Sequence, residues 1–266
     1  MKHPQLLAYN LSPKAIAFST TRHGGYGMGN YGEFNINPYC GDSPEAISQN
    51  RKALCEMLGI NDNSLLFPHQ VHECRGVVID KDFLELPEQQ RKEKLDGFDY
   101  IATQESGICI GVSTADCVPI LLYSENPQII AAIHAGWRGT MKRIALNAVE
   151  NLKKNFGLDT CSCKAVIGPS ISCRAFEVGD EVYEAFRNEG FDMEKISMRT
   201  MRTNGKWHID LWKANAMQLE NAGICADNIS IAGICTYNDC KDFFSARRLG
   251  TLSGRIFSGL LIKQKQ

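Results

Sequence analysis

Three short apolar runs follow one another in the middle of the chain and constrain its fold more than any other feature. They are Ile108–Ser113, Val118–Tyr123 and Ile129–His134, each six residues long. Apolar runs of this length are typical of strands buried in a sheet, whereas a helix needs a pattern of ten or more residues. The sequence therefore predicts a buried sheet at the centre of the protein.

The rest of the chain alternates between further strands and helices. Strands are expected at Ala15–Thr20, Leu65–Phe67, Val77–Ile79, Tyr100–Ala102, Ala165–Gly168 and Ile229–Thr236. Helices are expected from Pro44, from Thr140 and near Gly179–Asn188 and Leu211–Asn221. Ser43 followed by proline is a typical helix start, because serine caps the free N–H groups and proline fits the first turn. No internal repeat or low-complexity linker interrupts the pattern, so we expect one α+β domain over residues 1–266.

Charge and cysteine content limit the partners and the compartment. The 29 basic and 30 acidic residues nearly cancel, so no global field favours nucleic acid or a membrane surface. Eleven cysteines are an odd number in a chain too long for a small disulfide scaffold, which indicates reduced thiols. The first residues lead into no apolar run of the kind found in a secretory signal. We expect a cytoplasmic protein that binds neither nucleic acid nor membrane.

Histidines and one cysteine lie at the ends of predicted strands. His72 follows the segment His69-Gln70-Val71, Cys117 separates two of the apolar runs, and His134 ends the third. His72 is preferred over His69 as a ligand because His69 follows Pro68. Two imidazoles and one thiolate form a zinc set with an open fourth position, which is the pattern of a catalytic site. The sequence predicts Zn²⁺ bound by His72, Cys117 and His134, with Cu²⁺ as an alternative occupant.

The same residues are compatible with other chemistry. Cys117 could act as a nucleophile with His134 as its base, in a hydrolase that needs no metal. Asp116 precedes Cys117 and is our candidate for proton transfer, although a structural carboxylate fits the position equally well.

Arginines form a second group of candidates, because the guanidinium group matches phosphate and carboxylate oxygens. Those near glycine-rich or ligand-bearing segments, together with an asparagine that could contact a sugar or base, are Arg22, Asn35, Arg138, Arg247 and Arg248. Arg255 follows soon after this group. The sequence does not show whether these side chains converge.

Several longer motifs, in order, make the chain resemble the laccase-domain family, also labelled multicopper polyphenol oxidases. They are Ser19–Gly25, Gly41-Asp42, Asn50-Arg51, Gln70–His72, Asp96–Asp99, Ala115–Ile120, His134–Gly139, Ile167–Ile171, Phe176–Gly179, Phe244-Ser245 and Arg247-Arg248. The resemblance covers nearly the whole chain. Ala246 departs from it, because an aromatic residue is expected there.

The resemblance implies a mixed-sheet α+β sandwich with flanking helices, related to cysteine-hydrolase-like toxin folds. His72, Cys117 and His134 match the zinc ligands of the family. The implied activity is phosphorolysis of purine nucleosides, with adenosine deamination in the same pocket and methylthioadenosine as a further substrate class. Nucleoside and phosphate are then the small-molecule partners, and we expect a monomer.

The older label of the family implies copper-dependent phenol oxidation. An oxygen-reducing copper cluster needs many imidazoles, and this chain has six histidines without repeated His-x-His pairs. One copper could still occupy a two-histidine, one-cysteine site. We therefore rank the oxidase second, ahead of the metal-free hydrolase.

Overall fold

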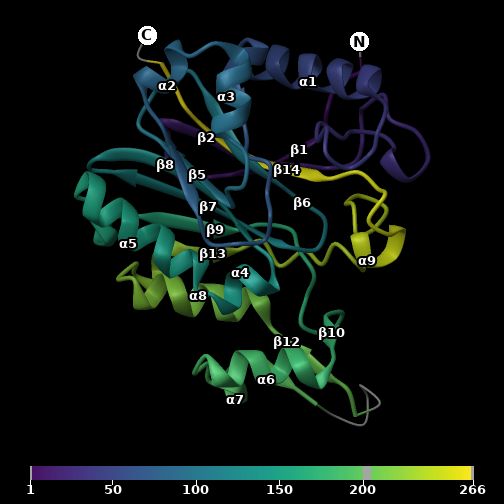
Figure 1. Cartoon of the computed structure of the whole chain (residues 1–266), viewed down its shortest axis with the longest axis vertical. Helices are drawn as coiled ribbons and strands as arrows, with labels where there is room; N and C mark the ends of the chain where they lie inside the picture. Colours follow the sequence, from purple (N-terminus) through teal and green to yellow (C-terminus); the bar gives the residue numbers. More distant parts are fainter. Residues whose placement is uncertain (1, 200–204, 265–266) are drawn as a thin grey trace.

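The computed structural model describes residues 2–199 and 205–264, and within these ranges two large sheets pack on each other (Figure 1). In spatial order, the first sheet contains β1 (Leu6–Tyr9), β2 (Ala15–Thr20), β14 (Ile256–Ile262), β6 (Cys109–Thr114) and β3 (Leu65–Leu66). Adjacent strands in this sheet run antiparallel, except that β3 and β6 are parallel. Its central strand therefore comes from the C-terminal end of the chain.

The second sheet holds six strands and contains two of the predicted ligand positions. In spatial order, they are β13 (Ile229–Ile231), β9 (Lys164–Ile167), β7 (Val118–Glu125), β8 (Gln128–Ala135), β5 (Tyr100–Thr103) and β4 (Gly76–Ile79). Strands β7 and β8 form an antiparallel hairpin in which Val118 lies opposite Ala135. This register brings Cys117, just before β7, close to the end of β8.

Side chains on β7 alternate between two cores, as expected for a strand buried on both faces. Leu121 and Tyr123 face the first sheet, where they pack in a cluster with Ile110 and Leu260. Ile120 and Leu122 point the other way, into the cluster beneath the helices. Burial on both faces explains why the run is apolar without a break.

Helices cover the outer faces of the sandwich (Figure 1). Helix α1 (Pro44–Leu58) packs Leu54 and Cys55 against the five-stranded sheet. Helices α5 (Ile144–Phe156) and α8 (Leu211–Asn221) cover the six-stranded sheet. The remaining α-helices are α2 (Lys81–Glu85), α3 (Glu88–Lys94), α4 (Trp137–Met141), α6 (Asp180–Asn188), α7 (Met193–Ile196) and α9 (Ala246–Leu249). Short 3₁₀ turns occupy Gly29–Tyr31, Asp62–Ser64, Thr160–Ser162 and Ala226–Asn228.

A small third sheet lies beyond α8 with helices α6 and α7, at the bottom of Figure 1. It consists of β10 (Glu177–Val178), β12 (Trp207–Ile209) and β11 (Ser197–Met198), in that spatial order. Trp207 stacks on Tyr183 of α6, with ring centroids 3.8 Å apart. This aromatic contact joins the small sheet to its helix.

The α+β class and most predicted elements are confirmed, with two corrections and several omissions, among them β1 and β14. Thr140 does not start a helix: it is buried in α4, and α5 begins after Arg143, whose φ of 61° breaks the helical path. The strand predicted at Ile229–Thr236 ends at Ile231. Strand β14 was not predicted. The relation of the whole fold to cysteine-hydrolase-like toxin folds stays a prediction. Among the described helices, none is long and apolar enough to cross a membrane.

Candidate metal centre and active-site cleft

The three predicted metal ligands lie together. One ligand atom from each of His72, Cys117 and His134 falls within 4.8 Å of the others, and Cys117 Sγ is 3.9 Å from His72 Nε2. His72 comes from the loop between β3 and β4, Cys117 from the approach to β7, and His134 from the end of β8. The β7–β8 hairpin fixes the last two relative to each other.

A buried carboxylate holds two of these ligands in place. Asp99 is fully buried, and its Oδ1 accepts hydrogen bonds from His134 Nδ1 at 2.7 Å and from the backbone N–H of His72 at 2.9 Å. Its Oδ2 accepts from the backbone N–H groups of Glu73 at 2.7 Å and Val71 at 3.3 Å. Because Asp99 holds Nδ1 of His134, the other ring nitrogen is left free to act as a ligand.

Two non-glycine residues beside the site have a left-handed backbone conformation, which neighbouring contacts must stabilise. His72 and Asp116 have φ angles of 64° and 82°, in the left-handed region that non-glycine residues rarely occupy. The bonds from Val71–Glu73 to Asp99 stabilise the first of these turns. A Cβ atom on Gly136 would lie 3.1 Å from both Cys117 Sγ and His72 Cδ2, so glycine at this position lets the third segment approach the ligands.

The electrostatics of the site favour an ionised thiol. Burial opposes ionisation of Cys117, but His134 and His72 outweigh it and lower the pKa of the thiol to about 6. Burial likewise opposes the charge on His134, whereas the Cys117 thiolate and Asp99 raise the pKa of this imidazole to about 9. Burial alone would raise the pKa of Asp99, but bonds from His134 and the backbone hold it below its ordinary value. The thiolate is the form that binds a metal.

The donor set fits a tetrahedral zinc ion. Zn–S and Zn–N bonds of about 2.3 and 2.0 Å at a tetrahedral angle place sulfur and nitrogen about 3.6 Å apart. The separation of 3.9 Å between Cys117 Sγ and His72 Nε2 needs only a small adjustment. Three protein ligands would leave one coordination position of a tetrahedral ion open. The three residues can therefore bind a metal, and donor chemistry alone does not separate zinc from copper.

The ligands lie in the wall of a cleft with a volume of about 340 Å³, at the small end of the usual range for small-molecule sites. Its other lining residues are Asn37, Tyr39, Cys40, His69, Gln70, Ser113, Thr114, Ala115, Ala246, Thr251 and Arg255. Gln70 is anchored to β6, since its side chain donates to the Ser113 carbonyl and accepts from the Ser113 N–H. Ala246, the departure from the family pattern, also lies in this wall.

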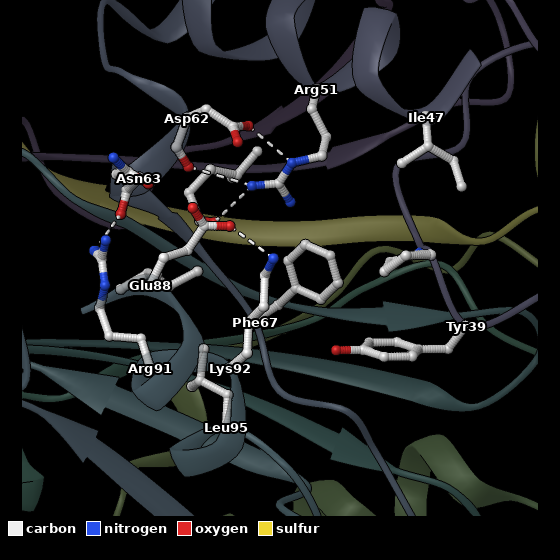
Figure 2. A pocket seen from close by; sticks show the side chains of 13 residues that line it. Tyr39, Ile47, Arg51, Asp62, Asn63, Phe67, Glu88, Arg91, Lys92 and Leu95 are labelled. Atoms are coloured by element: carbon white, nitrogen blue, oxygen red, sulfur yellow. Dashed lines mark hydrogen bonds and ion pairs between the residues drawn. The ribbon is translucent and has the colours of Figure 1, made fainter. Parts of the chain in front are cut away.

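Tyr39 separates this cleft from a second cavity. The second cavity has a volume of about 280 Å³ and lies between α1 and α3. Figure 2 shows the Tyr39 ring at its edge, with the hydroxyl pointing toward Lys92 and Leu95. Two ion pairs lie in the lining of this cavity, Arg51 with Asp62 and, within α3, Lys92 with Glu88. Tyr39 thus forms part of both walls.

The predicted substrate-binding residues do not gather in the cleft wall. Among the described residues that line it, none is Arg22, Asn35, Arg138, Arg247 or Arg248. Three of these guanidinium groups donate to backbone carbonyls instead: Arg22 to Gly32 and Cys240, Arg247 to Glu177, and Arg248 to Tyr237. The guanidinium of Arg138 packs over the ring of Trp137 at 4.3 Å. Their roles in binding stay predictions.

Asn35 and Asp116 organise the loops around the cleft. Asn35 is fully buried, and its side chain donates to Asp42 and accepts from the backbone N–H of Arg255. Asp116 accepts at 2.7 Å from both the Thr236 hydroxyl and the backbone N–H of Arg247. Each side chain therefore joins distant parts of the chain, and a proton-transfer role for Asp116 stays a prediction.

Sequence reasoning missed Asp99, Tyr39 and Gln70 as parts of the site. Asp99 belongs to a motif that was recognised, but nothing in the sequence links it to His134, 35 residues away. Arg255 was noticed and left out of the candidates, yet it is the arginine in the cleft wall. The motifs locate these residues, while only the folded chain shows their contacts.

Comparison with known proteins agrees with this architecture. The sequence model of the family described as "Multi-copper polyphenol oxidoreductase laccase" matches residues 16–263. The chain belongs to this family. A protein of Bacteroides thetaiotaomicron named purine nucleoside phosphorylase is 48% identical over 92% of this chain and 90% of its own length. Adenosine deaminase RL5, from an unknown prokaryotic organism, is 43% identical over 93% of this chain and 94% of its own length.

Solved structures of the family share the fold. The hypothetical protein YfiH of Bacillus licheniformis superposes with a TM-score of 0.90 and 26% identity, covering 98% of this chain and 97% of its own. YlmD of Geobacillus stearothermophilus gives a TM-score of 0.88 and 27% identity, covering 99% of this chain and all of its own. With relatives named as enzymes over almost its full length, this family member is an enzyme, and the cleft is its candidate active site.

Proposed function

We propose that this protein is a zinc-dependent purine nucleoside phosphorylase that also deaminates adenosine. The observation that carries the proposal is the His72–Cys117–His134 set, held by Asp99, in the wall of a cleft of nucleoside size. The names of relatives at 48% and 43% identity support the two activities. Inosine, adenosine and guanosine are the proposed nucleosides, with methylthioadenosine as a further class.

Different residues of the cleft would bind the metal, orient its ligands and orient the nucleoside. His72, Cys117 and His134 would hold the metal, and Asp99 would keep the His134 ring oriented. Zinc in such a site supplies a Lewis acid and lowers the pKa of a bound water toward about 7, which suits both cleavage and deamination. The apolar and polar side chains of the cleft would orient the nucleoside beside the ligands.

Phosphate needs a positive group, and Arg255 supplies one in the cleft wall. Its Nη atoms donate to Ser253, Gly254 and Thr251, while its Nε has no partner among the described residues. Arg22, Arg247 and Arg248 were predicted for the same role, but none of them is among the described residues that line the cleft. We propose Arg255 as the first phosphate contact.

Copper-dependent phenol oxidation is the second candidate, and it rests on the description of the family. The chain has six histidines, and among the described residues the only group of three or more ligand-type side chains includes just two of them. His23 pairs with Asp242, and His208 contacts the carbonyl of Cys173. One copper fits this donor set, whereas the several imidazoles of an oxygen-reducing cluster do not.

The test is chromatography of the purified protein incubated with inosine or adenosine, with and without phosphate. Release of free base that depends on phosphate supports phosphorolysis, and conversion of adenosine to inosine without phosphate supports deamination. Oxidation of a phenolic dye by copper-loaded protein, with nucleosides unchanged, would favour the oxidase. Hydrolysis of an ester or amide by zinc-free protein would favour Cys117 as a nucleophile.

We also propose that residues 1–266 act as one catalytic domain and as a monomer. The two large sheets share a continuous core, and the cleft takes residues from loops of both. Light scattering at micromolar concentration tests the oligomeric state. A stable dimer would refute the monomer and leave the proposed reaction untouched.

A further inference from the structure

The cleft contains a second histidine–aspartate pair, separate from the metal ligands. His69 lines the cleft, and its Nδ1 lies 2.6 Å from Oδ1 of Asp96. The His69 ring stacks on Tyr39, with centroids 4.1 Å apart and an angle of 30° between the planes. Its side chain is 42% exposed, so a bound substrate can reach it.

The position of His69 is fixed on several sides. Its backbone N–H donates to Leu95 and its carbonyl accepts from Gly97, at 2.9 and 3.0 Å. Tyr39, which covers one face of the imidazole, extends its hydroxyl into the neighbouring cavity toward Lys92 (Figure 2). A ring held by its backbone, a carboxylate and an aromatic face is oriented before the substrate binds.

The contacts also determine which ring nitrogen can act on a substrate. Asp96 accepts from Nδ1, so Nε2 is the atom that can give or take a proton. Nε2 of His69 has no hydrogen-bond partner among the described residues. Asp116, in contrast, uses both carboxylate oxygens to hold Thr236 and Arg247. Of the two groups, His69 has the free atom at the cleft.

We propose that His69 is the general acid that protonates the departing purine, oriented by Asp96. This rests on the proposed phosphorolysis. A phosphate oxygen forms a bond to C1′ of the ribose while the C1′–N9 bond breaks and its electron pair moves into the purine. The protonated imidazole gives its Nε2 proton to N7 of the purine. The proton that the attacking phosphate carried then leaves the sugar phosphate and restores the imidazolium through solvent.

Leaving-group dependence tests this role. Guanosine needs a proton at N7 on cleavage, whereas 7-methylguanosine carries a methyl group there and its base leaves without a proton. In His69→Asn, the asparagine amide keeps a donor for Asp96 but no acid. We expect kcat for guanosine to fall by about 100-fold or more, while kcat for 7-methylguanosine changes by less than about tenfold. Zinc content should equal that of the unsubstituted protein.

His23→Asn is the matched control, because His23 is also half-exposed and bonded to an aspartate, at 2.7 Å, but does not line the cleft. It should leave both rates unchanged. Equal losses of kcat on both nucleosides in His69→Asn would overturn the proposal, as would an unchanged kcat for guanosine. A raised KM for phosphate with kcat unchanged would show that His69 binds phosphate instead. If the unsubstituted protein cleaves neither these two nucleosides nor inosine and adenosine in the presence of phosphate, the proposed function fails first and the role of His69 falls with it.

Discussion

Replacing Asp99 by asparagine is the sharpest test of how the metal site is held. Asp99 has no exposed surface and accepts four hydrogen bonds, two at each oxygen. Asparagine keeps the shape but offers only one acceptor atom. If its oxygen faces His134 and the His72 N–H, its amide meets the N–H groups of Val71 and Glu73, and these two part-buried donors lose their acceptor.

The magnitude follows from those two donors. An unsatisfied buried donor costs about 1–3 kcal/mol, and because both of these donors are only part-buried, Asp99→Asn should lower the free energy of unfolding by roughly 1–3 kcal/mol in total. If the amide turns around, it donates to His134 Nδ1, and the ring nitrogen needed for the metal then carries the proton. Loss of such a support typically weakens metal binding by about 10–100-fold. Both orientations therefore weaken the site.

The assay combines urea unfolding with zinc titration against a competing chelator. Asp96→Asn is the matched control, since the Asp96 side chain is largely exposed and, among the described residues, hydrogen-bonds to His69 alone. We expect it to change stability by less than about 1 kcal/mol and zinc affinity hardly at all. Wild-type stability and zinc affinity in Asp99→Asn would refute the reasoning, because the four bonds would then contribute nothing.

Three further perturbations act on other parts of the site. Gly136→Ala should weaken zinc binding without removing a ligand, because its Cβ would lie 3.1 Å from Cys117 Sγ; competition titration measures this, and unchanged affinity contradicts it. In zinc-free protein, the rate at which Cys117 reacts with a thiol reagent should rise with pH around a midpoint near pH 6, because the lowered pKa keeps the thiol ionised above that pH and protonated below it. Cys117→Ser gives the background rate of the other thiols. A midpoint near pH 9 would show that the histidines do not stabilise the thiolate. Arg255→Gln should raise the KM for phosphate about tenfold or more, the value of a lost charged hydrogen bond, while Arg248→Gln should have little effect; the reverse result would restore the phosphate site expected from the sequence.

The fold was largely predictable where strands are buried on both faces. Strand β7 reads as an unbroken apolar run because Ile120 and Leu121 point into different cores, and helix α1 carries its start signal in Ser43-Pro44. Strand β14 escaped prediction although its burial is complete. Its Gly259 lies opposite Gly111 on β6, where Phe257 fills the space, so the run looks interrupted when only neighbours in sequence are considered.

Two of the candidate metal ligands, Cys117 and His134, were predictable because each stands at the end of a predicted strand, and the hairpin register brings them together. His72 lies in the loop between β3 and β4 and was found through its motif. The supporting contacts were not predictable. Asp99 reaches His134 only because β5 and β8 pair, and Asp96 reaches His69 only because the loop before β5 returns to the loop after β3. The arginines illustrate the other side of this limit: their residue type suits phosphate, but residue type does not show that Arg22 and Arg247 contact backbone carbonyls, and their role in phosphate binding stays a prediction.

We propose that a metal held by His72, Cys117 and His134 supports phosphorolysis of purine nucleosides in this cleft. The direct measurement is ³¹P NMR of inosine and phosphate with three samples of the protein: zinc-loaded, stripped by a chelator, and reloaded with zinc. We expect a ribose 1-phosphate signal in the first and third samples and none in the second. Absence of that signal with zinc-loaded protein, or an equal signal after complete removal of zinc, would contradict it.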